Sequence, residues 1–431
     1  MRLTCFLISV KLALYWVGVM RDKKFLLHLG LIILGTLFYF VANFQRIAVP
    51  GAIFDILEQE LNVGAPEITA FGAIYMYVYA FTQLLNGVFV DRYGGYRVML
   101  IGAIIMTVGC IIFPVTSNLS LMYFARALLG IGGSMFYLSL IKELGFLFEE
   151  KDFGIALSIM LFMGYAGGIA ANAPFVIAMR VLSWREILLI IAGVVLVSVI
   201  AYLCLLPKVK LQDINKHVGL KALPFKLVLH KSHNRALFTF ACCNFGISYV
   251  IQTVIGKKFL EDFCLMTSAK AAVVLSIMAI VAAVFNIVNA SVCKLFHNHR
   301  VIFLKGASYI TFLSLFIICI LIWFNVRTVF IAFIFCILAA NASLSSLLVP
   351  VLYATNRKMI SGTAVSILNF SYFMAVGLLG TLTGYILHVF EPTRIGKTLV
   401  YNNNSYLLLF SVFLILSIYE IFRATKLSDK Y

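Results

Sequence analysis

The chain has 431 residues, of which 63% are hydrophobic and only 12% are charged. A soluble domain carries about 25% charged residues, so this composition excludes a water-soluble globular protein. The formal net charge of +17 points to a nucleic acid or to a membrane surface, depending on where the charges lie. Nine cysteines show no paired spacing, and we interpret them as small apolar side chains rather than disulfides or metal ligands.

Apolar runs recur along the whole length, and each is long enough to cross a hydrocarbon layer of about 30 Å as a helix. The pattern predicts an all-α, multi-pass membrane protein. We expect twelve spans, at residues 26–54, 66–90, 97–115, 119–141, 153–178, 185–206, 235–256, 269–293, 301–323, 327–352, 361–388 and 404–422.

Residues 1–24 precede the first span. Their apolar stretch, 5–20, is interrupted by Lys11, is short for a span, and is not followed by the small-residue cleavage site of a signal peptide. We expect this segment to lie along the membrane surface, unless the natural start of the protein is Met20.

Lys and Arg concentrate in the segments that share a side with the N-terminus. Twelve spans place both termini on one side, and the great majority of the basic residues then fall in the loops and tails of that side. The positive-inside tendency assigns this side to the cytoplasm. The high net charge therefore reflects membrane topology and not binding to nucleic acid.

The polar stretch 207–234 divides the chain into a six-helix bundle at 25–206 and a second at 235–422, followed by a tail at 423–431. A weak internal repeat supports two related halves. The sequence Gly154-Ile-Ala-Leu-Ser-Ile opens the fifth predicted span, and Gly362-Thr-Ala-Val-Ser-Ile opens the eleventh. Many transporters are built from two such bundles around a site at the membrane midplane.

The loop between the second and third spans reads GVFVDRYGGYR. Its residues Gly87, Asp91, Arg92, Gly94 and Arg97 match, at fixed spacing, the signature loop of the major facilitator superfamily, with Tyr96 in place of a basic residue. From about residue 25 to 422 the chain resembles this superfamily. The resemblance implies the major facilitator fold with twelve helices, secondary transport, no enzymatic activity and no cofactor.

The resemblance also implies a gating role for this loop. Asp91 would contact the start of the eleventh helix, near Gly362, and hold the cytoplasmic side closed while the opposite side is open. The alternative is a solvated turn that only obeys the positive-inside tendency. The matching loop of the second half, 293–300, keeps its basic residues but lacks the Asp and both glycines.

Two arginines, Arg46 and Arg126, fall inside predicted spans, where a charge costs about 2.5 kcal/mol or more. The resemblance places the first and fourth helices around a central cavity, so both guanidinium groups would face one pocket. No Asp or Glu falls in the middle of a predicted span. Such a cavity favours an anionic substrate, because guanidinium groups bind carboxylates and phosphates bidentately. The alternative is an arginine that hydrogen-bonds the backbone or extends to the membrane surface.

Other polar residues of the spans are candidate substrate contacts, although such residues more often bond between helices. They are Tyr75, Tyr79, Gln83, Tyr137, Asn244, Gln252 and Asn341. Runs of Phe and Tyr are interpreted as lipid-facing and interfacial residues.

We therefore predict a carrier of a small organic anion, nearest in character to organic-anion and organophosphate carriers, that works by alternating access. Exchange for another anion, or protons carried with the substrate, would drive it. The alternative is an exporter of drugs, siderophores or amino acids in which the buried arginines are structural. No catalytic residues and no metal-ligand spacing are recognisable. We expect a monomer in the bacterial inner (plasma) membrane, with the lipid bilayer and the substrate as partners and no nucleic acid.

Overall fold

The structure is a computed structural model that describes residues 23–209, 211, 225–295, 299–356, 358–396 and 398–428. The predictions for the N-terminal segment up to residue 22 and for half of the central loop, residues 210 and 212–224, lie outside the described residues.

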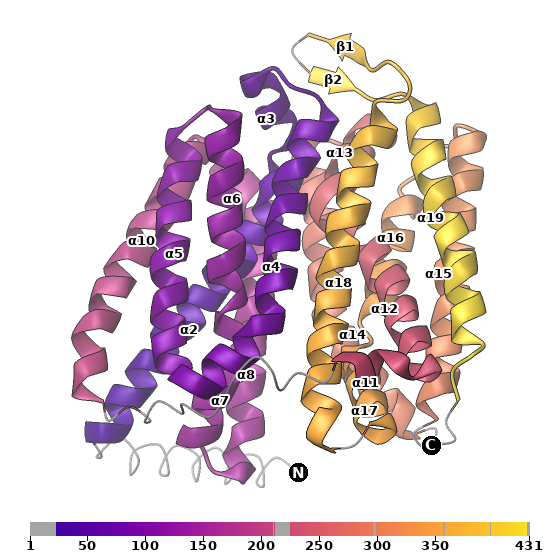
Figure 1. Ribbon diagram of the computed structural model, residues 1–431. Coiled ribbons are helices and arrows are strands. Elements are labelled where there is room, and N and C mark those ends of the chain that lie inside the picture. The colour runs from indigo at the N-terminus through magenta and orange to yellow at the C-terminus, as the bar shows by residue number, and fades with distance from the viewer. Residues whose placement is uncertain are drawn as a thin grey trace, which may run out of the picture.

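The first half of the chain forms one helical bundle (Figure 1, indigo to magenta). Its elements are α2 (Lys23–Ile47), η1 (Ala48–Ala52), α3 (Phe54–Leu61), α4 (Ala65–Tyr93), α5 (Gly95–Val115), α6 (Leu119–Ser134), α7 (Phe136–Leu147), α8 (Glu150–Ala170), α9 (Ala173–Ala178), α10 (Trp184–Leu205) and η2 (Leu206–Lys208).

The second half forms a bundle beside the first (Figure 1, rose to yellow). Its helices are α11 (Phe225–His230), α12 (Ser232–Val250), η4 (Ile251–Ile255), α13 (Gly256–Asp262), α14 (Ser268–Leu295), α15 (Arg300–Trp323), α16 (Phe330–Ala342), α17 (Ser345–Thr355), α18 (Lys358–Leu387) and α19 (Asn403–Ala424). Between α18 and α19, β1 (Thr393–Ile395) pairs with β2 (Thr398–Val400) as a short antiparallel hairpin.

The prediction of a multi-pass helical membrane protein is confirmed. In the described part of the chain, eleven helical segments are long and apolar enough to cross a membrane, and their bounds lie within a few residues of the predicted spans in most cases. The fourth and seventh spans are exceptions at their ends, because they continue to Leu147 and Asp262.

The fifth predicted span is not one continuous helix. It is α8 followed by the short α9, and the helix breaks at Asn172, whose backbone angles are φ −101° and ψ −109°. Pro174 lies in the first turn of α9. A proline has no N–H to donate to the carbonyl four residues before it, so it cannot continue α8 but is tolerated in the first turn of a new helix.

The internal repeat occupies equivalent positions in the two halves. Gly154 lies four residues after the start of α8, and Gly362 lies four residues after the start of α18. The two sequences therefore begin corresponding helices, as expected for two bundles of related design.

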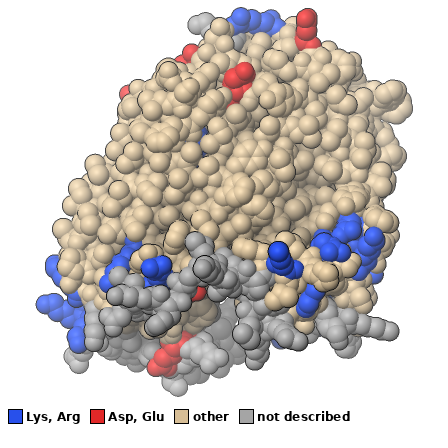
Figure 2. All heavy atoms as spheres, in the orientation of Figure 1, with Lys and Arg blue, Asp and Glu red and all other residues tan. Residues whose placement is uncertain are grey.

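The two ends of the molecule differ in charge. We call the end with α3, α13 and the β1–β2 hairpin the hairpin face, and the end with the α4–α5 turn, η2 and α11 the basic face. Figure 2 shows Lys and Arg gathered toward the basic face, with a wide uncharged band between the two ends. That band is the surface expected to contact lipid hydrocarbon.

The two halves pack closely between the middle of the molecule and the hairpin face. A Cβ added at Gly51 would lie 2.6 Å from the carbonyl oxygen of Thr253, and one added at Gly377 would lie 2.6 Å from the ring of Tyr77. The Tyr77 hydroxyl is also 2.8 Å from the hydroxyl of Thr381. Toward the basic face, a Cβ at Gly87 would meet nothing within 4 Å. The structure is therefore closed at the hairpin face.

Candidate functional site

Arg126 is completely buried and bonded to the backbone. Its Nε donates to the carbonyl of Phe71, Nη1 donates to Gln45, and Nη2 donates to Val49, each at 2.9 Å. These bonds connect α6 to α4 and to both sides of the turn from α2 into η1. The geometry favours the backbone-bonded alternative for this residue, because its donors are already used by protein oxygens.

Arg46 lies between the two halves and is only partly buried. Its guanidinium carbon is 5.8 Å from the ring centroid of Tyr79 in α4, 5.4 Å from Tyr249 in α12 and 5.3 Å from Phe373 in α18. These distances are typical of cation–π contacts. Nη2 donates to the side-chain oxygen of Asn43.

The charge of Arg46 is not matched by a carboxylate in the described part of the chain. The groups closest to it electrostatically are tyrosine hydroxyls, those of Tyr249, Tyr79, Tyr75 and Tyr39. Its Nε is buried and has no hydrogen-bond partner of normal geometry among the described residues. A cation with an unused donor between the two halves is suited to bind an anion.

Residues Gln45 and Val49 bracket Arg46 in the sequence, and Arg126 bonds the carbonyls of both. The two arginines predicted for one pocket thus have different positions. Arg46 faces the space between the halves, whereas Arg126 holds the backbone on either side of it. Arg126 therefore bears on the position of Arg46 but does not face the same space.

Of the four candidate residues in α4 and α7, two lie around Arg46 and two do not. Tyr79 and Tyr75 surround Arg46, and the Tyr75 hydroxyl also donates to the carbonyl of Ala42 at 3.2 Å. Tyr137 packs its ring against Tyr39, 6.2 Å between centroids. Gln83 is buried, and its Oε1 has no hydrogen-bond partner in the described part of the chain.

The candidates of the second half lie mainly inside that bundle. Asn244 donates to Thr311 and to Glu420, both at 3.0 Å, and Asn341 donates to Thr311 at 2.8 Å. Glu420 is fully buried. These bonds connect α12, α15, α16 and α19 and have the form of interhelical polar contacts. Gln252 is buried within η4.

A buried lysine joins the two halves at the hairpin face. Lys258 of α13 is fully buried, and its Nζ lies 2.6 Å from Asp55 of α3 and 2.9 Å from Asp262 of its own helix. Burial disfavours the Asp55 carboxylate, but the attraction of Lys258 outweighs it and keeps the pKa of Asp55 below its ordinary value. We call Asp55, Lys258 and Asp262 the hairpin-face latch.

Glu58, one turn further along α3, makes a second contact across the halves. The hydroxyl of Tyr401, just after β2, donates a hydrogen bond to Glu58 Oε1. Burial raises the pKa of Glu58 to about 8, although the bond from Tyr401 and the charge of Lys258 oppose the rise. Glu58 therefore binds its proton more tightly while this face is closed than a free carboxyl group would.

The signature loop turns at Gly94, whose φ of 84° and ψ of 151° are suited to glycine. Asp91 forms its ion pair with Lys142 of α7, at 3.5 Å, and its side chain is 67% exposed. Arg97 donates to the carbonyl of Tyr93 at 3.1 Å, and Arg92 lies over the Tyr93 ring. The surroundings of Gly362 lie outside what the structure describes, so the expected contact of Asp91 with the eleventh span stays a prediction.

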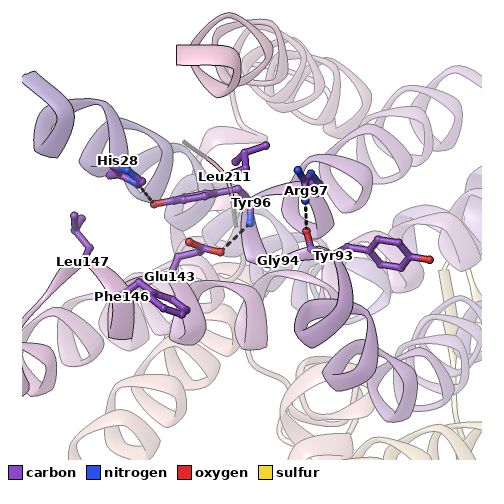
Figure 3. A pocket seen from close by; sticks show the side chains of 9 residues that line it. All are labelled: His28, Tyr93, Gly94, Tyr96, Arg97, Glu143, Phe146, Leu147 and Leu211. Atoms are coloured by element: carbon purple, nitrogen blue, oxygen red, sulfur yellow. Dashed lines mark hydrogen bonds between the residues drawn. The ribbon is translucent and has the colours of Figure 1, made fainter. Parts of the chain in front are cut away.

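A cavity of about 200 Å³ opens beside this loop (Figure 3). Glu143 accepts from the backbone N–H of Tyr96 at 3.2 Å, and the Tyr96 hydroxyl lies 2.9 Å from Nδ1 of His28. A buried carboxylate at the first N–H groups of α5 stabilises that end of the helix. The cavity belongs to the first half and lies at the basic face, away from Arg46. Its lining residues are His28, Tyr93, Gly94, Tyr96, Arg97, Glu143, Phe146, Leu147 and Leu211.

The prediction from sequence missed two residues that lie against Arg46, namely Tyr249 and Phe373. The interpretation of the Phe and Tyr runs as lipid-facing is wrong for both, since their rings lie between the halves. Hydropathy gives no signal for this, because an aromatic ring suits lipid and protein interior equally. Within the described residues, no cluster of three or more His, Cys, Asp or Glu side chains could hold a metal ion.

Comparisons with known proteins agree with this architecture. A model of the Major Facilitator Superfamily matches residues 31–381. The chain is 21% identical to a probable sulfoacetate transporter, SauU, of Cupriavidus necator over 158 residues, which are 37% of this chain and 36% of that relative. The match spans about a third of the relative's length.

Two solved structures share the fold at 13% sequence identity. A bacterial homolog of the human lysosomal transporter Spinster, in an inward-facing and unoccupied conformation, has a TM-score of 0.69 and covers 94% of this chain and 98% of its own. A POT family transporter in complex with 5-aminolevulinic acid has a TM-score of 0.72 and covers 93% and 96%.

Proposed function

The chain belongs to the major facilitator superfamily, and we propose that it is a secondary active transporter of a small organic anion. The fold and the family make it a membrane transporter and not an enzyme. The observation that carries the proposed substrate class is Arg46. Its guanidinium lies between the two halves without a carboxylate partner among the described residues, and one of its donors is unused.

Two further observations support an anion. Arg126 donates its hydrogen bonds to the backbone around Arg46, and this support is what a cationic binding residue with a fixed position requires. The relative matched over a third of its length is named for sulfoacetate, an organic anion. The polar contacts of Asn244 and Asn341 within the second half leave Arg46 and the tyrosines as the proposed substrate contacts.

We propose that the basic face is cytoplasmic, in accordance with the positive-inside tendency. In that orientation the latch closes the outer side, and the state of the molecule is inward-facing. Release of the latch and closure of the halves around the signature loop would produce the opposite state. Exchange for a second anion, or protons carried with the substrate, would supply the driving force. The protein would act as a monomer in the inner membrane.

Uptake into proteoliposomes tests the proposal. Labelled monocarboxylates, dicarboxylates, phosphate esters and neutral amino acids are offered to the wild type, to Arg46→Gln and to Arg180→Gln, which removes an exposed cation outside the site. We expect uptake of an anion that Arg46→Gln abolishes and Arg180→Gln leaves unchanged. Uptake of neutral amino acids that is unaffected by Arg46→Gln would favour the alternative, an exporter-type carrier with structural arginines.

A further inference from the structure

Arg46 is enclosed by aromatic rings from both halves of the molecule. Tyr79 comes from the first half, whereas Tyr249 and Phe373 come from the second, and all three ring centroids lie within 5.8 Å of the guanidinium carbon. We infer that the substrate is a monoanion with a flat apolar body, and that Tyr249 and Phe373 select it. This inference rests on the proposed function of Arg46 as the anion ligand.

The charge of the site limits the charge of the substrate. Arg126 is bonded to three backbone carbonyls. At the hairpin face, the buried Lys257 is paired with Glu261 at 2.9 Å, and Lys258 is paired with Asp55 and Asp262. Among the described residues, this leaves one cation for a ligand between the halves. A second negative charge on the ligand would be buried there without a partner, which is strongly unfavourable.

The walls of the site limit the shape of the substrate. Phe373 contacts Tyr79, with 4.5 Å between ring centroids, and Tyr249 stacks on Phe245 at 4.8 Å with an interplanar angle of 19°. Tyr75 stacks on Tyr79 in the same manner, at 6.1 Å and 16°. Ring faces of this kind bind planar apolar groups and offer little to a small hydrated ion. An aromatic or similarly flat body gains most from contact with them.

Two polar atoms beside the rings are suited to the anionic group itself. The hydroxyl of Tyr249 lies beside the guanidinium of Arg46 and interacts with it, yet neither this hydroxyl nor the Nε of Arg46 has a hydrogen-bond partner of normal geometry in the described part of the chain. One belongs to the first half and the other to the second. A carboxylate oxygen that accepts from both would bridge the halves, so recognition of the anion and closure of the site would occur together.

The test uses four labelled or competing anions on the full-length protein in proteoliposomes: benzoate, acetate, phthalate and sulfoacetate. Benzoate has one charge and a ring, acetate lacks the ring, and phthalate and sulfoacetate carry a second acidic group. We expect the wild type to take up benzoate, or to be inhibited by it, at concentrations about tenfold or more below those of the other three.

Two variants separate the contributions of the two residues. Phe373→Leu keeps an apolar side chain and removes the ring, so we expect the preference for benzoate over acetate to fall about fivefold or more while acetate uptake remains. Tyr249→Phe keeps the ring and removes the hydroxyl, so affinity for benzoate and acetate should fall together, about tenfold. Phe81→Leu, which removes an exposed ring that contacts Phe370, is the matched control and should change neither.

The possible failures are distinguishable. Arg46-dependent uptake in which phthalate or sulfoacetate matches or exceeds benzoate would overturn the inference and leave the proposed function in place. An unchanged preference in Phe373→Leu, with normal uptake, would overturn the selective role of that ring. If none of the anions is transported or inhibits transport, the inference and the proposed function both fail.

Discussion

Removing Asp55 from the hairpin-face latch should open that face. Lys258 is fully buried and has two carboxylate partners, Asp55 across the halves at 2.6 Å and Asp262 on its own helix at 2.9 Å. Loss of one partner of a buried ion pair costs about 3 to 5 kcal/mol when the remaining charge is left alone. Because Asp262 still neutralises Lys258, we expect Asp55→Asn to cost about 2 kcal/mol.

This cost applies only to the closed state, since the contact between α3 and α13 is lost when the halves separate. About 2 kcal/mol therefore shifts the equilibrium between the closed and open hairpin face roughly 30-fold toward the open form. The matched control is Asp262→Asn. It removes a carboxylate from the same lysine, but that carboxylate and Lys258 belong to one helix, and the bond from Lys258 to Asp55 remains.

Cysteine labelling measures the shift. Thr69 is fully buried, and a Cβ added at Gly384 of the other half would touch its hydroxyl oxygen, so Thr69→Cys reports separation of the halves at this face. A membrane-impermeant maleimide is applied from the hairpin side, and the signal of the same protein without Thr69→Cys is subtracted. We expect labelling to be about 30-fold faster with Asp55→Asn and changed far less with Asp262→Asn. Equal rates in the two variants would refute the reasoning.

Three further predictions concern other contacts. Closure at the hairpin face should weaken as pH rises from about 4.5 to about 8. The closed state raises the pKa of Glu58 above its ordinary value of 4.5 and so binds its proton more tightly than the open state does. Glu58→Gln should therefore flatten the pH dependence of Thr69→Cys labelling. Arg126→Met should lower the free energy of unfolding in detergent by several kcal/mol, because three buried carbonyls lose their donor. Arg46→Gln should leave the free energy of unfolding nearly unchanged. Asp91→Asn should slow turnover in proteoliposomes strongly while substrate affinity and expression stay near wild type; unchanged turnover would contradict a gating role.

The membrane spans could be predicted closely because hydrocarbon thickness imposes a minimum length on every apolar helix. The spans predicted at 97–115 and 301–323, for example, are the helices Gly95–Val115 and Arg300–Trp323. The break at Asn172 was missed because its cause is local, a single Pro174 inside an otherwise apolar run. A window of hydropathy averages over such a residue.

The site was harder to predict than the fold. Both intramembrane arginines are visible in the sequence because a charge in hydrocarbon is costly. The contacts that distinguish the two arginines are not visible in the sequence. Arg126 binds backbone carbonyls, which every residue has, and Arg46 contacts Tyr249 and Phe373 from helices far along the chain. Only the packing of the two halves brings those rings to the first helix.

The arrangement of the first helix connects the proposed substrate site with the latch. Arg46 lies at the end of α2, Arg126 fixes the carbonyls of Gln45 and Val49 on either side of it, and α3 with Asp55 follows directly after η1. A displacement of Arg46 would therefore be transmitted through a backbone that Arg126 binds on both sides of it. This backbone continues through η1 into α3, the helix that closes the hairpin face. Under the proposed function, an anion that draws Arg46 toward Tyr249 would pull the two halves together on the same side of the molecule as the latch. Occupancy of the proposed site and closure of that face would thus be linked through one short stretch of chain.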